Sequence, residues 1–314
     1  MNPQTVGGQA VIEGVMMKAP TRLAVALRLP GGEILVKDDP FRSLAARFPL
    51  LAKPFIRGPV ILGETLVLGM KALSYSAQKA LADEEEEEGL GSWALALTML
   101  GAVALGLALF VALPHLLALG LGRVAPRGFD ETTLAFHLTD GGLKTLIFLA
   151  YLWSISLMKD IRRVFEYHGA EHKAIYCYES GGELSVAAAR GYSRLHPRCG
   201  TAFLLVVLLV SILIFTVVFP LLPRLAAAAW ANQAAQIGLK TVLMLPVAGI
   251  SYEIIRLAGQ KAGHPLCRAL LWPGLQLQKL TTREPSDDQI EIALAALKAA
   301  LSEGAGRETC LPVP

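Results

Sequence analysis

TAFLLVVLLVSILIFTVVFPLL, residues 201–222, is the stretch of this sequence that decides its fold class. No charged side chain interrupts it, and its length matches the roughly 20 apolar residues that an α-helix needs to cross the hydrocarbon core of a bilayer. Within lipid, a helix satisfies its own backbone hydrogen bonds, so such a run is read as a spanning helix. The stretch therefore predicts an integral membrane protein.

Three further segments pass the same length test, and the composition of the whole chain agrees with them. Only 18% of its 314 residues are charged, the mean hydropathy is +0.49, and soluble chains carry about 25% charged residues. We therefore predict a mainly α, polytopic protein with about four transmembrane helices. The other three spans are residues 92–121, 143–158 and 237–257, the last being the weakest because charged residues lie near its ends.

The distribution of lysine and arginine predicts the orientation of these helices. Cytoplasmic loops are enriched in both residues, and here they are concentrated before the first span and in the loop of residues 159–200. Residues 1–30 contain no long apolar run of the kind found in signal peptides. We expect both termini in the cytoplasm, and a multi-pass protein of the cell (plasma or inner) membrane that contacts the lipid bilayer.

The remaining segments suggest smaller units around the membrane domain. LAVALRL (23–29) and EILVK (33–37) flank a Pro-Gly-Gly turn, which indicates a β-hairpin. The expected units are a cytoplasmic β-like region (1–42), interfacial or core amphipathic helices (43–82), an acidic linker (83–91), the four-helix membrane domain (92–257) and cytoplasmic or interfacial C-terminal helices (258–314).

EYHGAEHKAIYCYE, residues 166–179, is the stretch with the most chemistry. His168 and His172 lie four residues apart, so on a helix both could direct a ring nitrogen at one ion, and Glu171 reaches the same space. In helical zinc sites with this spacing, two histidines bind the metal and the glutamate activates water. The alternative is a pair of solvated surface histidines, and the pattern alone does not decide between the two.

Two further motifs are expected at the same membrane face. HPRCG (196–200) precedes the third span and offers His196 and Cys199, both competent zinc ligands. Glu253 lies near the cytoplasmic end of the fourth span, where a carboxylate needs a partner. These residues are therefore candidate ligands of one metal centre. The alternatives are a helix cap with a small buried thiol for HPRCG, and a salt bridge to a nearby Arg256 or Lys261 for Glu253.

Two other motifs are open to interpretation. HPLC (264–267) repeats the H-P-x-C spacing, so His264 and Cys267 could complete a His2Cys2 zinc site with HPRC, although two helix-starting prolines would give the same pattern by coincidence. GGQAVIEGVMMKAP (7–20), which contains Glu13, suggests a tight loop or strand whose backbone closely approaches another group. A plain β-turn with packing methionines is the alternative.

The order of these motifs resembles the YqhQ family, and the resemblance covers nearly the whole chain. The motifs that carry it are GGQAVIEGVMMKAP, PFIRGPVILGETLVLGMKALSYSA, EYHGAEHKAIYCYE, HPRCGTAF, SYEIIRLAG and WPGLQLQKLTTREPSDDQIEIALAAL. This is a bacterial family of uncharacterised membrane proteins labelled as predicted metal-dependent enzymes. The resemblance implies that Glu13, His168, Glu171, His172, His196, Cys199 and Glu253 lie in motifs typical of the family. HPLC is not one of its motifs.

These observations favour a metal-dependent membrane protein that opens to the cytoplasm. A divalent metal, expected to be zinc, would be bound by His168 and His172 with a third ligand from Glu253 or His196, and Glu171 would act as general base. The expected substrate is a membrane-embedded peptide or lipid. The alternative is a non-enzymatic factor in membrane-protein assembly or homeostasis, in which a structural metal or polar network ties the spans together.

Other classes of protein fit the sequence less well. A net charge of +3 without a clustered basic face argues against a nucleic-acid partner. No phosphate-binding loop, dinucleotide fingerprint or serine-nucleophile motif is present. A transporter is weaker because charges in the predicted spans are scarce and no inverted repeat is visible. The sequence does not indicate an oligomeric state.

Overall fold

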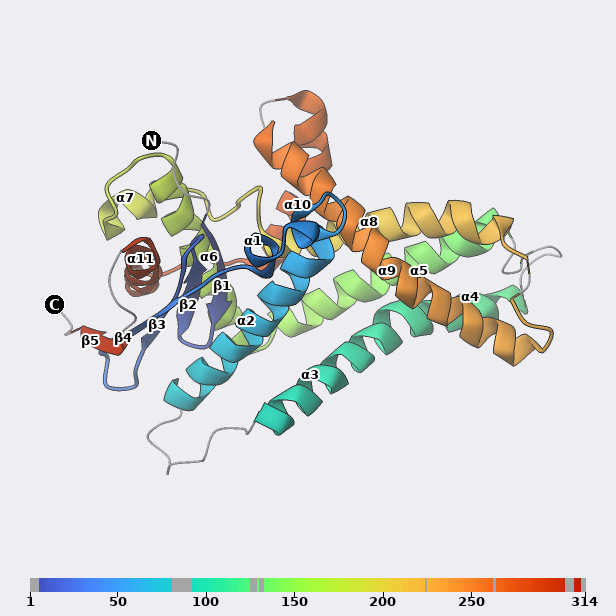
Figure 1. Ribbon diagram of the computed structural model, residues 1–314, viewed down its shortest axis with the longest axis horizontal. Coiled ribbons are helices and arrows are strands. Elements are labelled where there is room, and N and C mark those ends of the chain that lie inside the picture. The colour runs from blue at the N-terminus through green and yellow to red at the C-terminus, as the bar shows by residue number, and fades with distance from the viewer. Residues whose placement is uncertain are drawn as a thin grey trace.

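The computed structural model describes residues 6–80, 92–124, 129, 133–223, 225–261, 264–302 and 308–311. Figure 1 shows a small sheet with its helices at one end and long helices extending away from it. The acidic segment 83–91, predicted to be a linker, lies outside the described residues.

The sheet is antiparallel, with its five strands in the order β1-β2-β3-β4-β5. The hairpin predicted around Pro30-Gly31-Gly32 is confirmed, because β3 pairs with β4 in a register that places Arg28 opposite Ile34. The last strand comes from the other end of the chain and pairs with β4, which the sequence reading did not predict. The strands are β1 (Gly7–Val11), β2 (Gly14–Lys18), β3 (Arg22–Arg28), β4 (Ile34–Pro40) and β5 (Glu308–Leu311).

Both faces of the sheet are covered by helices. Successive side chains of a strand point to opposite faces, so Met16 and Met17 enter different cores. One face packs against α6 (Lys159–Glu179), α7 (Val186–Arg190) and α11 (Asp287–Leu301), and the other packs against α2 (Arg57–Ala80). Burial of both faces explains why the middle of β2 (Val15–Met17) and of β3 (Leu23–Leu27) is continuously apolar instead of alternating with polar residues.

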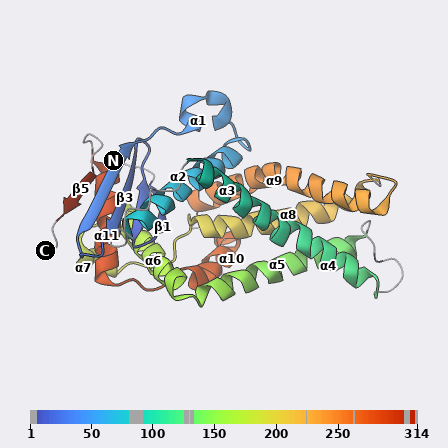
Figure 2. The ribbon, with the colours of Figure 1, turned by 90° about the horizontal axis from the view of Figure 1, so that it is seen from below.

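The long helices form a bundle on the other side of α2 and α6 (Figures 1 and 2). In this bundle α4 contacts α5, α5 contacts α8, α8 contacts α9, and α10 packs across α8 and α9. Its members are α3 (Ser92–Leu107), a π-helical turn η2 (Ala108–Ala112), α4 (Leu113–Gly122), α5 (Leu134–Ser156), α8 (Gly200–Val218), η3 (Phe219–Leu221), α9 (Ala229–Gln260) and α10 (Pro265–Thr281). Two short elements, α1 (Leu44–Arg47) and η1 (Pro49–Ala52), precede α2.

Four helices in the described part are long and apolar enough to cross a membrane: Arg57–Ala80, Ala96–Gly122, Gly200–Leu221 and Ala229–Gln260. The predicted spans 92–121 and 201–222 coincide with two of them, and the weak fourth span lies within the longer α9. The predicted span 143–158 is the second half of α5. With α6, α5 passes the same test as a bent pair with an angle of 98°, which raises the possible number of spans to five.

The difference at α5 has a physical cause. The helix begins nine residues earlier than the predicted span because Asp140 is paired with Lys144 and with Lys240 of α9. These partners let the carboxylate lie inside the bundle. A hydropathy average along the sequence falls at a charged residue, so the predicted span begins only after Asp140.

The C-terminal helices are confirmed. The segment predicted as an interfacial helix is α10, capped at its start by the His264 side chain, and its Trp272 is 61% exposed. The second C-terminal helix, α11, starts after Ser286, which forms a capping box with Gln289 at its first turn.

Candidate metal centre

The H-x-x-E-H motif lies in the middle of α6, and contacts from distant parts of the chain fix that helix in place. Gly169 allows a close approach, since a Cβ atom there would lie 2.1 Å from the Arg283 carbonyl oxygen. On the sheet side, Glu13 accepts hydrogen bonds from Arg163 (Nη2–Oε2 2.6 Å) and from the Tyr167 hydroxyl at 3.2 Å. The sheet and the segment between α10 and α11 therefore hold α6 from two sides.

His168, His172 and Cys199 form a group in which the three potential ligand atoms all lie within 4.8 Å of one another. Cys199 is the N-cap of α8, so the end of the membrane helix brings its thiol to α6. His168 Nε2 is 3.2 Å from Cys199 Sγ. The group is buried, with His172 only 1% and Cys199 only 6% exposed.

Hydrogen bonds to backbone carbonyls determine which nitrogen of each imidazole faces the group. His168 Nδ1 donates to the Thr281 carbonyl oxygen at 2.8 Å, and His172 Nδ1 donates to the Arg194 carbonyl oxygen at 2.6 Å. In both rings Nε2 is therefore the nitrogen left for a ligand; at His168, Nε2 faces Cys199 and would bind a metal after losing the proton that the thiolate stabilises. Metal-binding histidines nearly always show this arrangement, in which the second ring nitrogen donates to an outer partner.

Glu171 lies beside this group and is 5% exposed. Its Oε2 atom and His172 Nε2 are both buried without a hydrogen-bond partner among the described residues. Burial raises the pKa of Glu171, although the neighbouring His168 and His172 oppose that shift. A buried carboxylate oxygen without a donor is costly, and its position next to three potential ligands indicates that a further group belongs there.

The charges of the group favour a cation. Burial alone would lower the pKa of His168, but the neighbouring Cys199 thiolate raises it to about 9. Burial would likewise raise the pKa of Cys199, but the positive charge of His168 lowers it well below the ordinary value. This shift favours the thiolate of Cys199, the form that binds metal. With two imidazoles and one thiolate, the group could hold a metal ion.

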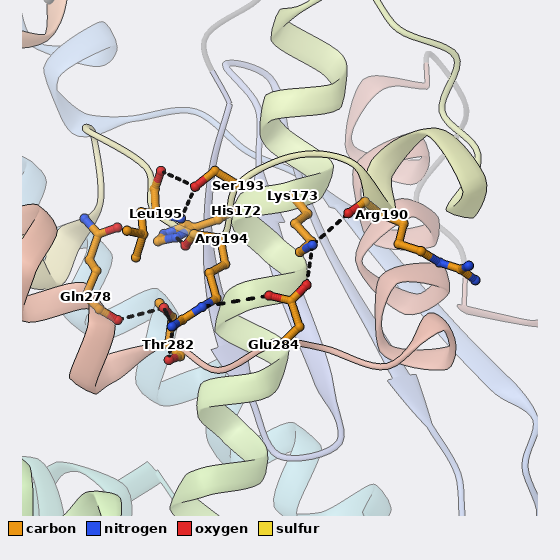
Figure 3. Close-up of polar contacts among 9 residues, drawn as sticks. All are labelled: His172, Lys173, Arg190, Ser193, Arg194, Leu195, Gln278, Thr282 and Glu284. Carbon is orange, nitrogen blue, oxygen red and sulfur yellow. Dashed lines mark hydrogen bonds and ion pairs between the residues drawn. The ribbon is translucent and has the colours of Figure 1, made fainter.

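A second layer of contacts fixes the segment that carries Arg194 and His196. Gln278 of α10 binds the His196 backbone twice, accepting from its N–H at 2.7 Å and donating to its carbonyl at 2.8 Å. Figure 3 shows Arg194 reaching from the His172 side to Thr282, whose hydroxyl lies 2.7 Å from Arg194 Nη1. The same figure shows Lys173 bound to the Arg190 carbonyl at 2.8 Å and to Glu284 at 2.5 Å.

The other predicted site residues lie at different distances from the group. His196 lies at the edge of the group, and its ring centroid is 5.7 Å from that of His172. Its Nε2 donates to Glu179 at 3.3 Å, and its Nδ1 accepts from the Arg198 N–H. Burial and the neighbouring His172 lower the pKa of His196 to about 4, so its imidazole is neutral. Both of its nitrogens have partners, so His196 is a neighbour of the ligands.

Glu253 does not join the centre. Its carboxylate is paired with Arg57 at the start of α2, with Nε–Oε1 at 2.8 Å, and also accepts the Phe55 N–H at 3.3 Å. The expectation that it supplies a third metal ligand is corrected here, because this ion pair already compensates its charge. The partner is Arg57, from a distant part of the sequence, instead of the nearby Arg256 or Lys261.

His264 and Cys267 are likewise separate from the group formed by His168, His172 and Cys199. The His264 side chain caps its own helix by accepting from the Leu266 N–H at 3.3 Å, and Cys267 is a half-buried free thiol on α10. The repeated H-P-x-C spacing thus reflects two helix starts. Glu13 also lies outside the group and acts on α6 through Arg163 and Tyr167.

A groove lies on the far side of Tyr176 from His196, and its lining does not include the residues of the centre. It has a volume of about 670 Å³ and lies between α10 and the segment around Leu195 and Pro197. Tyr176 forms part of its wall and packs edge-on against His196, with ring centroids 4.5 Å apart. On the opposite wall are the apolar Leu271 and Trp272 and the cationic Arg268.

The carbonyls of Thr281 and Arg194 and the amide of Gln278 were missed by sequence reasoning. A backbone carbonyl is present at every residue, so no residue type marks these acceptors. They become identifiable only when α10 is placed against α6.

Comparisons with known proteins give two matches. The profile of a family described as "Protein of unknown function (DUF1385)" matches residues 53–303. The "Uncharacterized protein YqhQ" of Bacillus subtilis is 32% identical over 309 residues, which cover 95% of this chain and 93% of that protein. No solved structure gives a significant match.

Proposed function

Because the chain belongs to the DUF1385 family, whose description names no activity, we propose a function from the chemistry of the centre. We propose that the protein is a zinc-dependent hydrolase of the cell membrane, with its centre at the cytoplasmic face. The observation that carries this proposal is the buried Glu171 carboxylate, which lies without a hydrogen-bond donor beside three potential ligand atoms within 4.8 Å of one another.

The residues of the centre divide into ligands and a base. His168, His172 and Cys199 would hold the ion, and a zinc ion held in this way lowers the pKa of a coordinated water to about 7. Glu171 would accept the proton of the attacking water, which suits a carboxylate whose pKa burial has raised toward neutrality. The hydrogen bonds of Thr281 and Arg194 keep each imidazole in the tautomer that leaves Nε2 free to bind.

The number of ligands favours catalysis over a purely structural metal. Structural zinc sites are closed by four protein ligands, whereas catalytic sites use three and keep a position open for water or substrate. Among the described residues the group has three members, and neighbouring His196 has both nitrogens engaged elsewhere. Glu171 could serve as a fourth ligand, and the experiments below separate that case.

The groove beside Tyr176 supports a lipid or a membrane-embedded peptide as substrate. It is mostly apolar and lies along α10, an amphipathic helix whose Leu266 and Trp272 are 65% and 61% exposed. Exposed tryptophan and leucine on such a helix favour the interface of a bilayer. A substrate could therefore reach the centre from the lipid surface.

The first experiment measures metal. Protein purified without chelators should contain zinc in stoichiometric amount, and His172→Ala and Cys199→Ala should each lose most of it. His264→Ala changes a histidine that lies outside the group and should keep the full amount. Wild-type protein without stoichiometric zinc, iron or manganese would exclude the proposal.

The second experiment separates enzyme from structural factor. Membranes of cells that express wild-type protein or Glu171→Gln are compared by mass spectrometry of lipids and of membrane peptides. An enzyme should form a product that the variant does not form, while the variant retains its metal and its abundance. A variant that loses metal or abundance, without any wild-type product, would instead favour a non-enzymatic factor in membrane-protein assembly or homeostasis.

A further inference from the structure

A second cluster of charged side chains lies inside the helical bundle, remote from the metal centre. Asp140 Oδ2 accepts from Lys240 Nζ at 2.6 Å and from Lys144 Nζ at 3.1 Å, so one carboxylate oxygen is shared by two ammonium groups. Asp140 and Lys144 lie on α5 and Lys240 on α9, and all three are at most 3% exposed. The sequence reading missed this cluster, because each charge was considered within its own span.

The charges of this cluster do not balance. In their ordinary ionisation states, two lysines and one aspartate carry a net charge of +1. An uncompensated charge in a low-dielectric interior is disfavoured by several kcal/mol. Such a group is normally neutralised by gaining or losing a proton.

The surroundings of the cluster favour cations and offer no place for an anion. From α8, the Phe215 ring faces Lys144 at 5.1 Å and the Phe219 ring faces Lys240 at 5.4 Å, both measured from Nζ to the ring centroid. Aromatic faces attract cations and repel anions. The second oxygen of Asp140, Oδ1, is buried without a partner among the described residues. The rings compensate the second ammonium group only in part, and release of one proton would remove the excess charge.

Two further side chains extend the cluster toward the end of the bundle. Lys240 Nζ donates to His115 Nδ1 of α4 at 3.0 Å, and His115 Nε2 donates to Gln233 Oε1 at 2.8 Å. Gln233 is half-buried and lies in the second turn of α9, near the end remote from the sheet. His137, the other titratable group of α5 near the cluster, packs against Phe136 and Phe219.

We propose that Asp140, Lys144 and Lys240 form a site that binds and releases one proton inside the membrane domain. His115 and Gln233 connect this site to the membrane face remote from the sheet. An ionisable cluster within candidate membrane helices is a functional site by default, because maintaining it in lipid is costly. The site is independent of the metal centre and of the hydrolase proposed above.

The test counts protons bound by the full chain in lipid nanodiscs. Wild-type protein and Lys144→Met are titrated between the ordinary pKa values of histidine and lysine, roughly 6.5 and 10.4. Lys144→Met leaves a balanced Asp140–Lys240 pair, so the bundle should fold, and Lys144→Gln serves as a second neutral variant. The difference between the two titrations should show a step of one proton per molecule that is complete well below pH 10, whereas the exposed-lysine control Lys298→Met should show only the onset of an ordinary lysine titration at the upper end of the range.

The route is tested by the rate of proton uptake after a pH jump. His115→Ala should slow uptake at least several-fold without changing the number of protons bound, whereas the exposed-histidine control His264→Ala should change neither. An unchanged far-UV circular dichroism spectrum and unchanged abundance in the membrane fraction confirm that each variant is folded. A flat difference titration would overturn the proposed site, since both lysines would then stay charged in a static ion-pair network. An unchanged uptake rate in His115→Ala would overturn the route.

Discussion

The position of Glu171 depends on a glycine from the first strand. A Cβ atom at Gly8 would lie 2.7 Å from Glu171 Cγ, which is closer than side chains pack. The expectation that GGQAVIEGVMMKAP brings backbone close to another group is confirmed at this contact. The methionines of the same motif are also buried in the two cores of the sheet. The motif thus combines packing with support of the centre.

Gly8→Ala should therefore displace the Glu171 side chain. We expect a loss of about 1–3 kcal/mol in the free energy of unfolding, the usual range for overpacking a filled interior. Gly7→Ala is a matched control, because nothing lies within 4 Å of a Cβ atom there, and it should stay within about 0.5 kcal/mol of wild type. Denaturant unfolding of the purified proteins measures both, and equal stabilities would contradict the close contact.

His196 should make the stability depend on pH on the acidic side. Burial lowers its pKa from 6.5 to about 4 in the folded protein, so the unfolded chain binds more protons between these values. The free energy of unfolding should therefore fall as the pH decreases from 6.5 to 4, by up to about 3 kcal/mol for this group. His196→Asn should show a shallower fall in the same titration of stability. Parallel curves for the two proteins would contradict a neutral buried imidazole.

Side-chain chemistry made part of the centre predictable. His168 and His172 share a helix face, so their spacing reveals the pair, and Cys199 follows from its place just before a membrane helix. Glu253 could not be assigned correctly, because its partner Arg57 is nearly two hundred residues away in the sequence. Which distant charges meet depends on how the helices pack. The periodic pattern of apolar residues along the sequence does not show this.

At the scale of elements, α2 could either cross a membrane or pack along the sheet, and the sequence pattern does not distinguish these two arrangements. It is long and apolar enough to cross a membrane, yet Ala72 and its neighbours cover one face of the sheet. At its other end, Arg57 joins Glu253 of α9. A helix that packs along the sheet stays on the side of the membrane where the sheet lies. The prediction of an interfacial or core helix over residues 43–82 is consistent with these contacts.

The contact between α9 and the segment before α2 should be sensitive to one methyl group. A Cβ atom at Gly249 would lie 2.2 Å from the Phe55 carbonyl oxygen, so Gly249→Ala should destabilise the protein by about 1–3 kcal/mol. Gly238→Ala on the same helix meets nothing within 4 Å and should instead stabilise by up to about 1 kcal/mol, as alanine favours helix. Thermal unfolding in detergent would show opposite shifts, and shifts of equal sign would contradict the contact.

At the scale of the whole molecule, both ends of the chain belong to one sheet. Gly7–Val11 forms β1 and Glu308–Leu311 forms β5, so the two ends lie on the same side of any membrane that the bundle crosses. An even number of crossings would follow, and the described part of the chain has four candidate spans, or up to five if the bent pair α5 and α6 is counted as one span. This is consistent with the predicted common location of the termini, although the distribution of charges alone could not show that β1 and β5 belong to the same sheet.

The hydrophobic core between the sheet and α6 should not form without α11. Ile290, Ile292 and Leu297 are at most 1% exposed and pack on the strands. A chain that stops after Arg283 should therefore lose its bound metal and fall several-fold in abundance in the membrane fraction, because the sheet and α6 lose their common cover. A chain that stops after Ser302 keeps α11 and should retain most of both. Equal metal content and abundance in the two truncated chains would contradict this dependence.

The late position of α11 and Thr281 in the sequence also sets an order of events during synthesis. Strands β1 to β4 leave the ribosome first, but one of their faces has no cover until α11 follows. At about 5–20 residues per second, the segment between β4 and α11 takes roughly 10 to 50 s to translate. During that interval four hydrophobic strands have to be kept from aggregating, and the ligands of the centre cannot be held in place. The proposed metal centre should therefore form only after α11 has been made.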